Sequence, residues 1–183
     1  MYQQSKYGIV RLRDNACIPE TEGNRDWVEF QTWVAQGNTP LSAPEPTITE
    51  RLQRNNAAYN AATDALTGDY PQLEKDTWPT QDTETKTWLA SPGNAETPWI
   101  DRAAKERGID KEEYVRRTLI KSRQFKVMSA FLTGRRQKYE DQIKAGGNPG
   151  LDFELTEEVL LELHAIQQTV MNTAAADLQE AML

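Results

Sequence analysis

Apolar residues recur every three or four positions over most of this chain, which is the spacing of one helix face. The N-terminal part differs. Residues 7–18 hold two short apolar runs around the turn Arg13-Asp14-Asn15, and this pattern predicts a β-hairpin. Residues 25–36 then predict a helix with one aromatic face, made of Trp27, Phe30 and Trp33. Because an isolated hairpin is only marginally stable, we expect this helix to pack on it, so that residues 1–38 form a ββα module.

Residues 39–47 have no periodic pattern and contain three prolines. Such a composition favours an extended tether over packed structure. Helical periodicity then resumes at Ile48. We therefore expect a helical domain over residues 48–146 and a C-terminal helix within residues 147–183. The predicted fold class is mainly α, with the small N-terminal ββα module tethered to an α-helical hairpin or bundle domain.

Glycine, proline and capping residues divide this helical part into segments. The helices predicted in this way span about 48–67, 97–107 and 110–144. A further helix contains Trp78. Proline has no amide hydrogen, so Pro79 predicts a start, a kink or a break near that tryptophan.

The last predicted helix runs from Thr156 to near Leu183. Its apolar positions lie three and four residues apart, at Val159, Leu163, Ile166 and Val170. Two interpretations stay open. The helix either packs against the basic helix at 110–144 or associates with a second copy of the chain.

The chain has 183 residues, of which 38% are apolar, and its net charge is −7. No run approaches the roughly 20 apolar residues of a membrane-spanning helix, so we expect no membrane insertion. The charge is uneven, since residues 102–138 hold 12 Lys or Arg and 4 Asp or Glu. We interpret this excess as a solvated helix face with acidic neighbours. It lacks the aromatic residues that stack on bases, so we expect no nucleic-acid partner.

Residue types suited to catalysis are scattered. His164 is the only histidine and Cys17 the only cysteine, so neither has the partner that a base, a nucleophile or a metal site requires. Glu74 and Glu84 are the least implausible glycosidase pair, but capping and pairing within helices account for both acids. We therefore predict a protein that is not an enzyme and that uses no cofactor and no metal ion. With no apolar leader at residues 1–6, synthesis in a reducing cytoplasm is expected.

The most distinctive segment sets large aromatic rings among polar side chains. Its marked positions are Tyr70, Glu74, Trp78, Gln81 and Trp88, and Trp99 follows within Thr97–Asp101. This pattern resembles a helical domain of uncharacterised biochemistry that recurs in small proteins of tailed-bacteriophage tail and tail-fibre cassettes. Segments 107–110 and 134–141 follow in the order and spacing of that domain, so the resemblance covers about residues 50–145. Residues 10–19 and 24–40 resemble the short N-terminal module of tail-fibre and tail-fibre-assembly proteins.

The resemblance implies a setting and supplies no active site. It indicates a non-enzymatic structural or interaction protein of a phage tail, bound to the tail fibre or its baseplate junction. Such a protein is synthesised in the host cytoplasm and resides in the virion tail. The alternative is a tail-fibre assembly chaperone that is not retained in the virion.

Aromatic residues of the N-terminal module are the first candidates for binding that partner. Trp27, Phe30 and Trp33 form either a miniature core or, where a ring stays partly exposed, a docking surface. The polar and aromatic residues of the motif between Tyr70 and Trp99 are expected to be structural.

Arg135 and Arg136, which follow Gly134, are the second candidates. Two guanidinium groups can hold a carboxylate of a partner chain through paired hydrogen bonds. They can equally pair with acids of the same bundle, and the expected acids are Glu74, Glu84 and Asp141.

Overall fold

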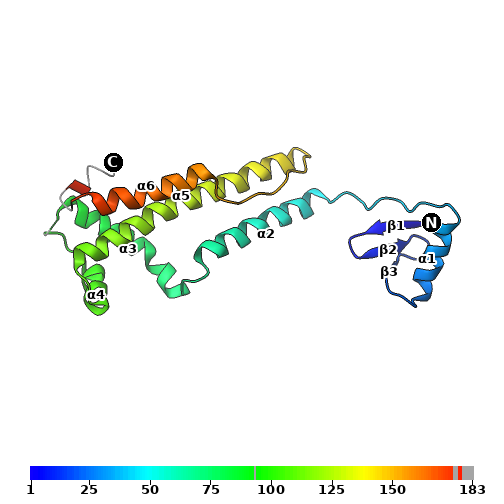
Figure 1. Ribbon diagram of the computed structural model, residues 1–183, viewed down its shortest axis with the longest axis horizontal. Coiled ribbons are helices and arrows are strands. Elements are labelled where there is room, and N and C mark those ends of the chain that lie inside the picture. Colours follow the sequence, from blue (N-terminus) through cyan, green and yellow to red (C-terminus); the bar gives the residue numbers. More distant parts are fainter. Residues whose placement is uncertain (93, 175–176, 179–183) are drawn as a thin grey trace. The chain divides into compact units, whose positions relative to one another are not determined.

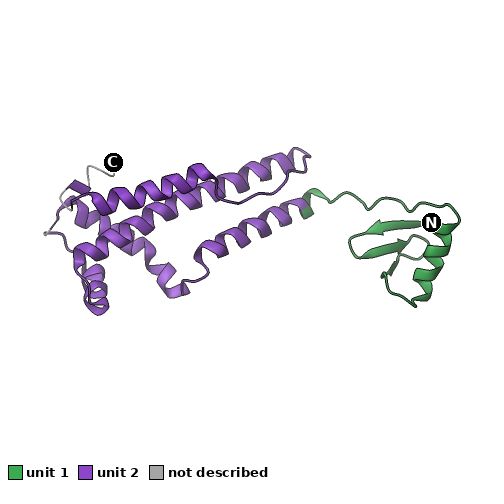
Figure 2. Ribbon diagram, viewed as in Figure 1, with its two compact units in different colours: residues 1–50 green, residues 51–183 purple. Residues whose placement is uncertain are grey.

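The computed structural model describes residues 1–92, 94–174 and 177–178. Within these residues the chain is mainly α-helical, with one small antiparallel sheet near the N-terminus (Figure 1). This arrangement confirms the predicted fold class. Contacts divide the chain into two compact units, residues 1–50 and residues 51–183 (Figure 2). Each unit has a hydrophobic core of its own.

The first unit is a three-stranded sheet with one helix. β2 (Gly8–Arg11) and β3 (Ala16–Ile18) form the predicted hairpin, and α1 (Arg25–Ala35) follows it. A further strand, β1 (Tyr2–Ser5), pairs antiparallel with β2. The predicted N-terminal module of strands and one helix is therefore present, with one strand more than the ββα prediction gave it. The sequence Tyr-Gln-Gln-Ser has a single apolar residue and so shows no alternation; this strand depends on its pairing with β2 and on the burial of Tyr2.

The core of the first unit is rich in aromatic rings. Its buried members are Tyr2, Ile9, Ile18 and Phe30, with Trp27 and Trp33 packed against them. The centroid of the Tyr2 ring lies 5.1 Å from that of Phe30 and 5.0 Å from that of Trp33. Tilted and edge-to-face rings at this separation stabilise a core beyond the area that they bury. The aromatic face of α1 therefore closes the sheet.

The predicted tether touches the sheet at one residue. Leu41 donates its amide to the Tyr2 carbonyl at 2.9 Å and accepts the Gln4 amide at 2.8 Å. These bonds place Leu41 in a short parallel bridge at the outer edge of β1. Part of the tether therefore packs against the first unit.

The second unit gathers helices around one long helix. α5 (Lys111–Lys144) is contacted by α3 (Gln72–Ala90), α4 (Pro98–Arg107) and α6 (Glu157–Asn172). Figure 1 shows α6 running back alongside α5. α2 (Ile48–Thr67) meets α5 through polar contacts: the buried Asn55 side chain donates to the Arg136 carbonyl at 2.9 Å.

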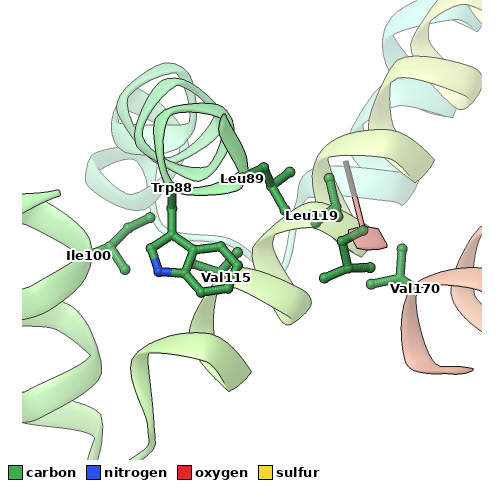
Figure 3. Close-up of a cluster of buried hydrophobic side chains, with 7 residues drawn as sticks. Trp88, Leu89, Ile100, Val115, Leu119 and Val170 are labelled. Carbon is green, nitrogen blue, oxygen red and sulfur yellow. The ribbon is translucent and has the colours of Figure 1, made fainter. Parts of the chain in front are cut away.

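The core of the second unit is built by α3, α4, α5 and α6 together with Leu178. Its buried side chains are Trp88, Leu89, Ile100, Val115, Leu119, Val170 and Leu178. Figure 3 shows the Trp88 ring from α3 beside Ile100 of α4 and Val115 of α5. Burial of such large apolar side chains is the main term that stabilises these helices.

Most helix bounds agree with the sequence prediction, and Pro79 is the exception. α2, α4 and α5 begin and end within a residue of the predicted positions. Pro79 lies inside α3, so of the three predicted effects near Trp78 a start and a break are wrong, and a kink stays a prediction. Pro79 is exposed and has no amide hydrogen, so the Lys75 carbonyl one turn earlier receives no helical hydrogen bond from it.

The last helix begins as predicted after Thr156 but ends earlier than expected. α6 stops at Asn172, and Thr173 has extended backbone angles, φ −91° and ψ 135°. The prediction that this helix continues past Asn172 is therefore wrong at Thr173. Its predicted end, near Leu183, lies outside the described residues. The physical reason is packing, because Leu178 is fully buried beside Val170 in the core. α6 packs against α5, which was one of its two open interpretations.

Candidate binding groove

An open groove lies in the second unit between the end of α2, α3 and α5. Its volume is about 500 Å³. The apolar side chains that line it are Leu66, Tyr70, Trp78, Pro79, Phe125 and Met128. Phe125 is 41% exposed, which is unusual for so large an apolar side chain. An apolar hollow with a few charged groups around it is the usual form of a binding site.

Helix periodicity explains why these side chains meet. On α3, Trp78 and Asp82 are four residues apart, and on α5, Lys121 and Phe125 are four apart, so each pair shares a helix face. α3 and α5 pack together, which brings the two faces into contact. The Trp78 ring centroid lies 5.2 Å from that of Phe125 and 5.4 Å from that of Tyr70, edge to face in both cases.

Asp82 is the polar junction of the groove. Its carboxylate accepts hydrogen bonds from Lys86 at 2.7 Å, from Lys126 at 2.8 Å and from the Ser122 hydroxyl. Burial acts to raise the pKa of Asp82, but these hydrogen bonds outweigh it and hold the pKa well below its usual range. Asp82 therefore stays ionised and ties α3 to α5 at the groove wall.

Two further lysines give the groove an excess of positive charge. The Lys121 ammonium lies 4.9 Å from the centroid of the Tyr70 ring, in a cation–π contact. The side chain of Lys75 lines the groove and forms no hydrogen bond or ion pair with the described part of the chain. Glu74 is exposed beside it. Three lysines, Lys75, Lys121 and Lys126, and two acids, Glu74 and Asp82, line the groove, so its charged side chains sum to +1.

The aromatic and polar motif divides between the groove and the core. The motif residues that line the groove are Tyr70, Glu74, Trp78 and Gln81. Trp88 is 6% exposed and belongs to the core. Trp99 is partly buried and packs against the core beside Tyr114. One helix stripe therefore passes from an open surface into the interior of the unit.

Glu84 caps the helix that follows the motif. Its two carboxylate oxygens accept the backbone amides of Trp99 at 3.2 Å and Ile100 at 2.9 Å, at the start of α4. Thr97, at the N-cap position, provides no side-chain bond to these amides. A carboxylate at this end also faces the positive pole of the helix dipole. Glu84 thus acts as a capping residue, although it lies on α3 and caps α4 instead of its own helix.

Arg135 and Arg136 pair within the unit, but not with the expected acids. Arg135 donates to the carboxylate of Asp152 at 2.9 Å, and Arg136 donates to that of Glu140 at 2.8 Å. The predicted pairing with Glu74, Glu84 or Asp141 is therefore wrong. The loop behind α5 folds back and brings Asp152 to Arg135, a contact that helix periodicity does not encode. A role of these arginines in holding a partner stays a prediction.

The aromatic docking candidates of the first unit lie in or against its core. Phe30 is 7% exposed, and Trp27 and Trp33 are partly buried. Phe30 is thus a core residue, and only the two tryptophans have surface to offer a partner. Their docking role stays a prediction.

Sequence reasoning did not single out Asp82, Ser122, Phe125 or Lys126. One signal was available, because Asp82 and Lys86 have the spacing of an ion pair along a helix. The contribution of α5 was not readable, since it depends on how two helices pack.

Within residues 1–92, 94–174 and 177–178, no helix is long and apolar enough to cross a membrane. Over the same ranges, no three His, Cys, Asp or Glu side chains lie close enough together to hold a metal ion.

Residues 120–150 match the family described as the HI1402 helical domain. The match begins in α5, includes the groove residues Phe125 and Met128, and ends in the loop behind that helix. It covers well under half of the chain. No curated protein and no solved structure matches the chain. These comparisons are consistent with the helical character of this region and assign no activity.

Proposed function

We propose that this protein is a non-enzymatic interaction protein of a bacteriophage tail, bound to the tail fibre or its baseplate junction. It is made in the host cytoplasm and is kept in the virion tail. Support comes from the ordered sequence segments that resemble phage-tail proteins and from the position that the fold gives to one of them.

The open groove is the observation that carries this proposal. A motif that only filled a core would be buried along its whole length, as it is at Trp88. Instead, Tyr70 and Trp78 line a hollow of about 500 Å³ that is open to solvent. A partner that fills such a hollow removes the aromatic side chains from contact with water. Trp and Tyr are also enriched among the residues that dominate binding at interfaces.

The location of the protein tests the tail assignment. We expect quantitative mass spectrometry of purified phage particles to find the chain in a fixed ratio to the fibre protein. A pull-down from infected cells, with this chain as bait, should recover the same fibre. Recovery from cells without any copy in the particle would instead assign the chain to fibre assembly. Absence from both preparations would contradict the phage-tail proposal.

A pair of bait variants tests the groove. Phe125→Ala removes the most exposed ring of the hollow and should reduce fibre recovery by about tenfold or more. Leu73→Ala is the matched control, because Leu73 is 78% exposed on α3 and does not line the groove. Equal recovery by both variants, with wild-type circular dichroism, would show that the fibre binds elsewhere.

A further inference from the structure

The first turns of α6 present acids next to exposed leucines. Glu157 and Glu158 lie in the first turn of the helix, and neither side chain forms a hydrogen bond or ion pair with the described residues. Leu160 and Leu161 follow, 44% and 62% exposed. Exposed apolar side chains flanked by charge are typical of a surface that meets a partner.

The groove has the complementary chemistry. Its exposed apolar surface comes from Trp78 on α3 and Phe125 on α5. Each of these helices also contributes a lysine that no acid among the described residues pairs with, Lys75 on α3 and Lys121 on α5. A short helix with two leucines and two neighbouring carboxylates matches this hollow in polarity and in sign of charge.

The groove and the outer face of α6 do not meet within one copy. Gln124 of α5 donates to the Leu163 carbonyl at 3.1 Å, and Arg116 of α5 donates to the Val170 carbonyl at 2.6 Å. These bonds fix α6 on α5, with Val159 and Val170 buried on the side that packs. Leu161 is exposed on the opposite side of the helix and so points away from α5, which forms one wall of the groove.

We propose that the start of α6 from one copy docks into the groove of a second copy. Leu160 and Leu161 pack on the aromatic rings, and the carboxylates of Glu157 and Glu158 pair with Lys75 and Lys121. The two surfaces differ, so two copies close a symmetric dimer when each helix enters the other groove. This self-docking needs no other protein and therefore does not rest on the phage-tail proposal.

Charge reversal in two variants tests the pairing. The groove variant carries Lys75→Glu and Lys121→Glu, and the helix variant carries Glu157→Lys and Glu158→Lys. In sedimentation velocity over a range of concentrations, we expect the wild-type chain to dimerise. Each variant alone should associate about tenfold more weakly or worse, because like charges then face each other. An equal mixture of the two should form a mixed dimer, since opposite charges meet at both of its contacts, in the reversed order at one and in the wild-type order at the other.

Leu161→Asp gives a second test that does not threaten the fold, because Leu161 is exposed. It should also weaken the dimer. Met171→Asp is the matched control on the same helix, since Met171 is 56% exposed and lies well beyond the first turns. Circular dichroism should show that all variants remain helical.

Three results would overturn the inference. They are a wild-type chain that is monomeric at every concentration, charge-reversed variants that dimerise like the wild type, and a mixture that stays monomeric. A monomeric chain that still recovers the fibre through Phe125 would reject self-docking and leave the tail proposal intact. Because the second copy and the fibre would occupy the same groove, fibre recovery is also measured with the helix variant, whose groove is unchanged and left open. A wild-type dimer together with a helix variant that recovers no fibre would reject the tail proposal alone.

Discussion

Asp82 shows how much of the groove depends on a single carboxylate. It receives donors from its own helix, through Lys86, and from α5, through Ser122 and Lys126. A buried or half-buried carboxylate with several donors is far more favourable charged than neutral. The distance between α3 and α5, and with it the width of the groove, is therefore set partly by electrostatics.

The depressed pKa of Asp82 predicts a dependence of stability on pH. Its folded pKa lies below the unfolded value of about 4, so the ionised group stabilises the fold above about pH 4 and this contribution is lost as the pH falls through the folded pKa. Asp82→Asn should lower the free energy of unfolding by about 1–2 kcal/mol near neutral pH. The difference from wild type should shrink at about pH 3 in urea unfolding followed by circular dichroism. A difference that stays constant with pH would contradict this account.

Glu84 predicts a second local effect. Glu84→Ala leaves two amides at the start of α4 without an acceptor, and Ile100 is fully buried there. The loss should be about 1–2 kcal/mol of unfolding free energy. Glu96→Ala is the control, since Glu96 is exposed just before the same helix. Thermal unfolding should separate the two variants, and equal melting temperatures would show that Glu84 is not the cap that matters.

At the scale of elements, short-range signals were readable and long-range ones were not. Asn24 and Gly108 act within a few residues of a helix end, so α1 and α4 could be placed from sequence. β1 could not be placed, because it exists through pairing with β2. The same holds for the groove: the stripe around Trp78 was visible, whereas the wall supplied by Phe125 required knowledge of how α5 packs.

The turn between β1 and β2 predicts an element-scale effect. Gly8 has φ +129°, and a Cβ there would lie 2.5 Å from the Ile18 carbonyl oxygen. Gly8→Ala should therefore break the sheet, by strain and by collision. Gly23→Ala is the comparison, because Gly23 also has a positive φ, +82°, and a Cβ there would meet no atom within 4 Å. Spectra of the backbone amides should show that the fold of the first unit is lost only in Gly8→Ala. An intact sheet in that variant would contradict the expected collision with the Ile18 carbonyl.

At the scale of the whole molecule, two separate cores imply two separable stabilities. Trp33 packs on Tyr2 and Phe30 in the first unit. Trp33→Ala should weaken fibre binding by about 2 kcal/mol or more, if the first unit docks as predicted. The helical unfolding transition of the second unit should be unchanged. Loss of both transitions together would show that the units do not fold independently.

The uneven distribution of charge along the chain is also explained at the scale of the whole molecule. Much of the positive charge of α5 is paired along the same helix, as for Arg116 with Glu112, Arg117 with Glu113 and Arg136 with Glu140. Whatever stability these pairs contribute, they reduce the positive field that a polyanion would feel. The pairing favours a solvated face over a nucleic-acid site.

The bridge at Leu41 also bears on aggregation. A bare strand edge offers unpaired amides and carbonyls that can template pairing with other chains. Leu41 covers this edge by binding the Tyr2 carbonyl and the Gln4 amide. A fragment that ends at residue 38 loses this cover, whereas one that ends at residue 47 keeps it. The tether therefore hinders edge-to-edge stacking between copies of the first unit. Of the two fragments, the shorter one should be the one that precipitates.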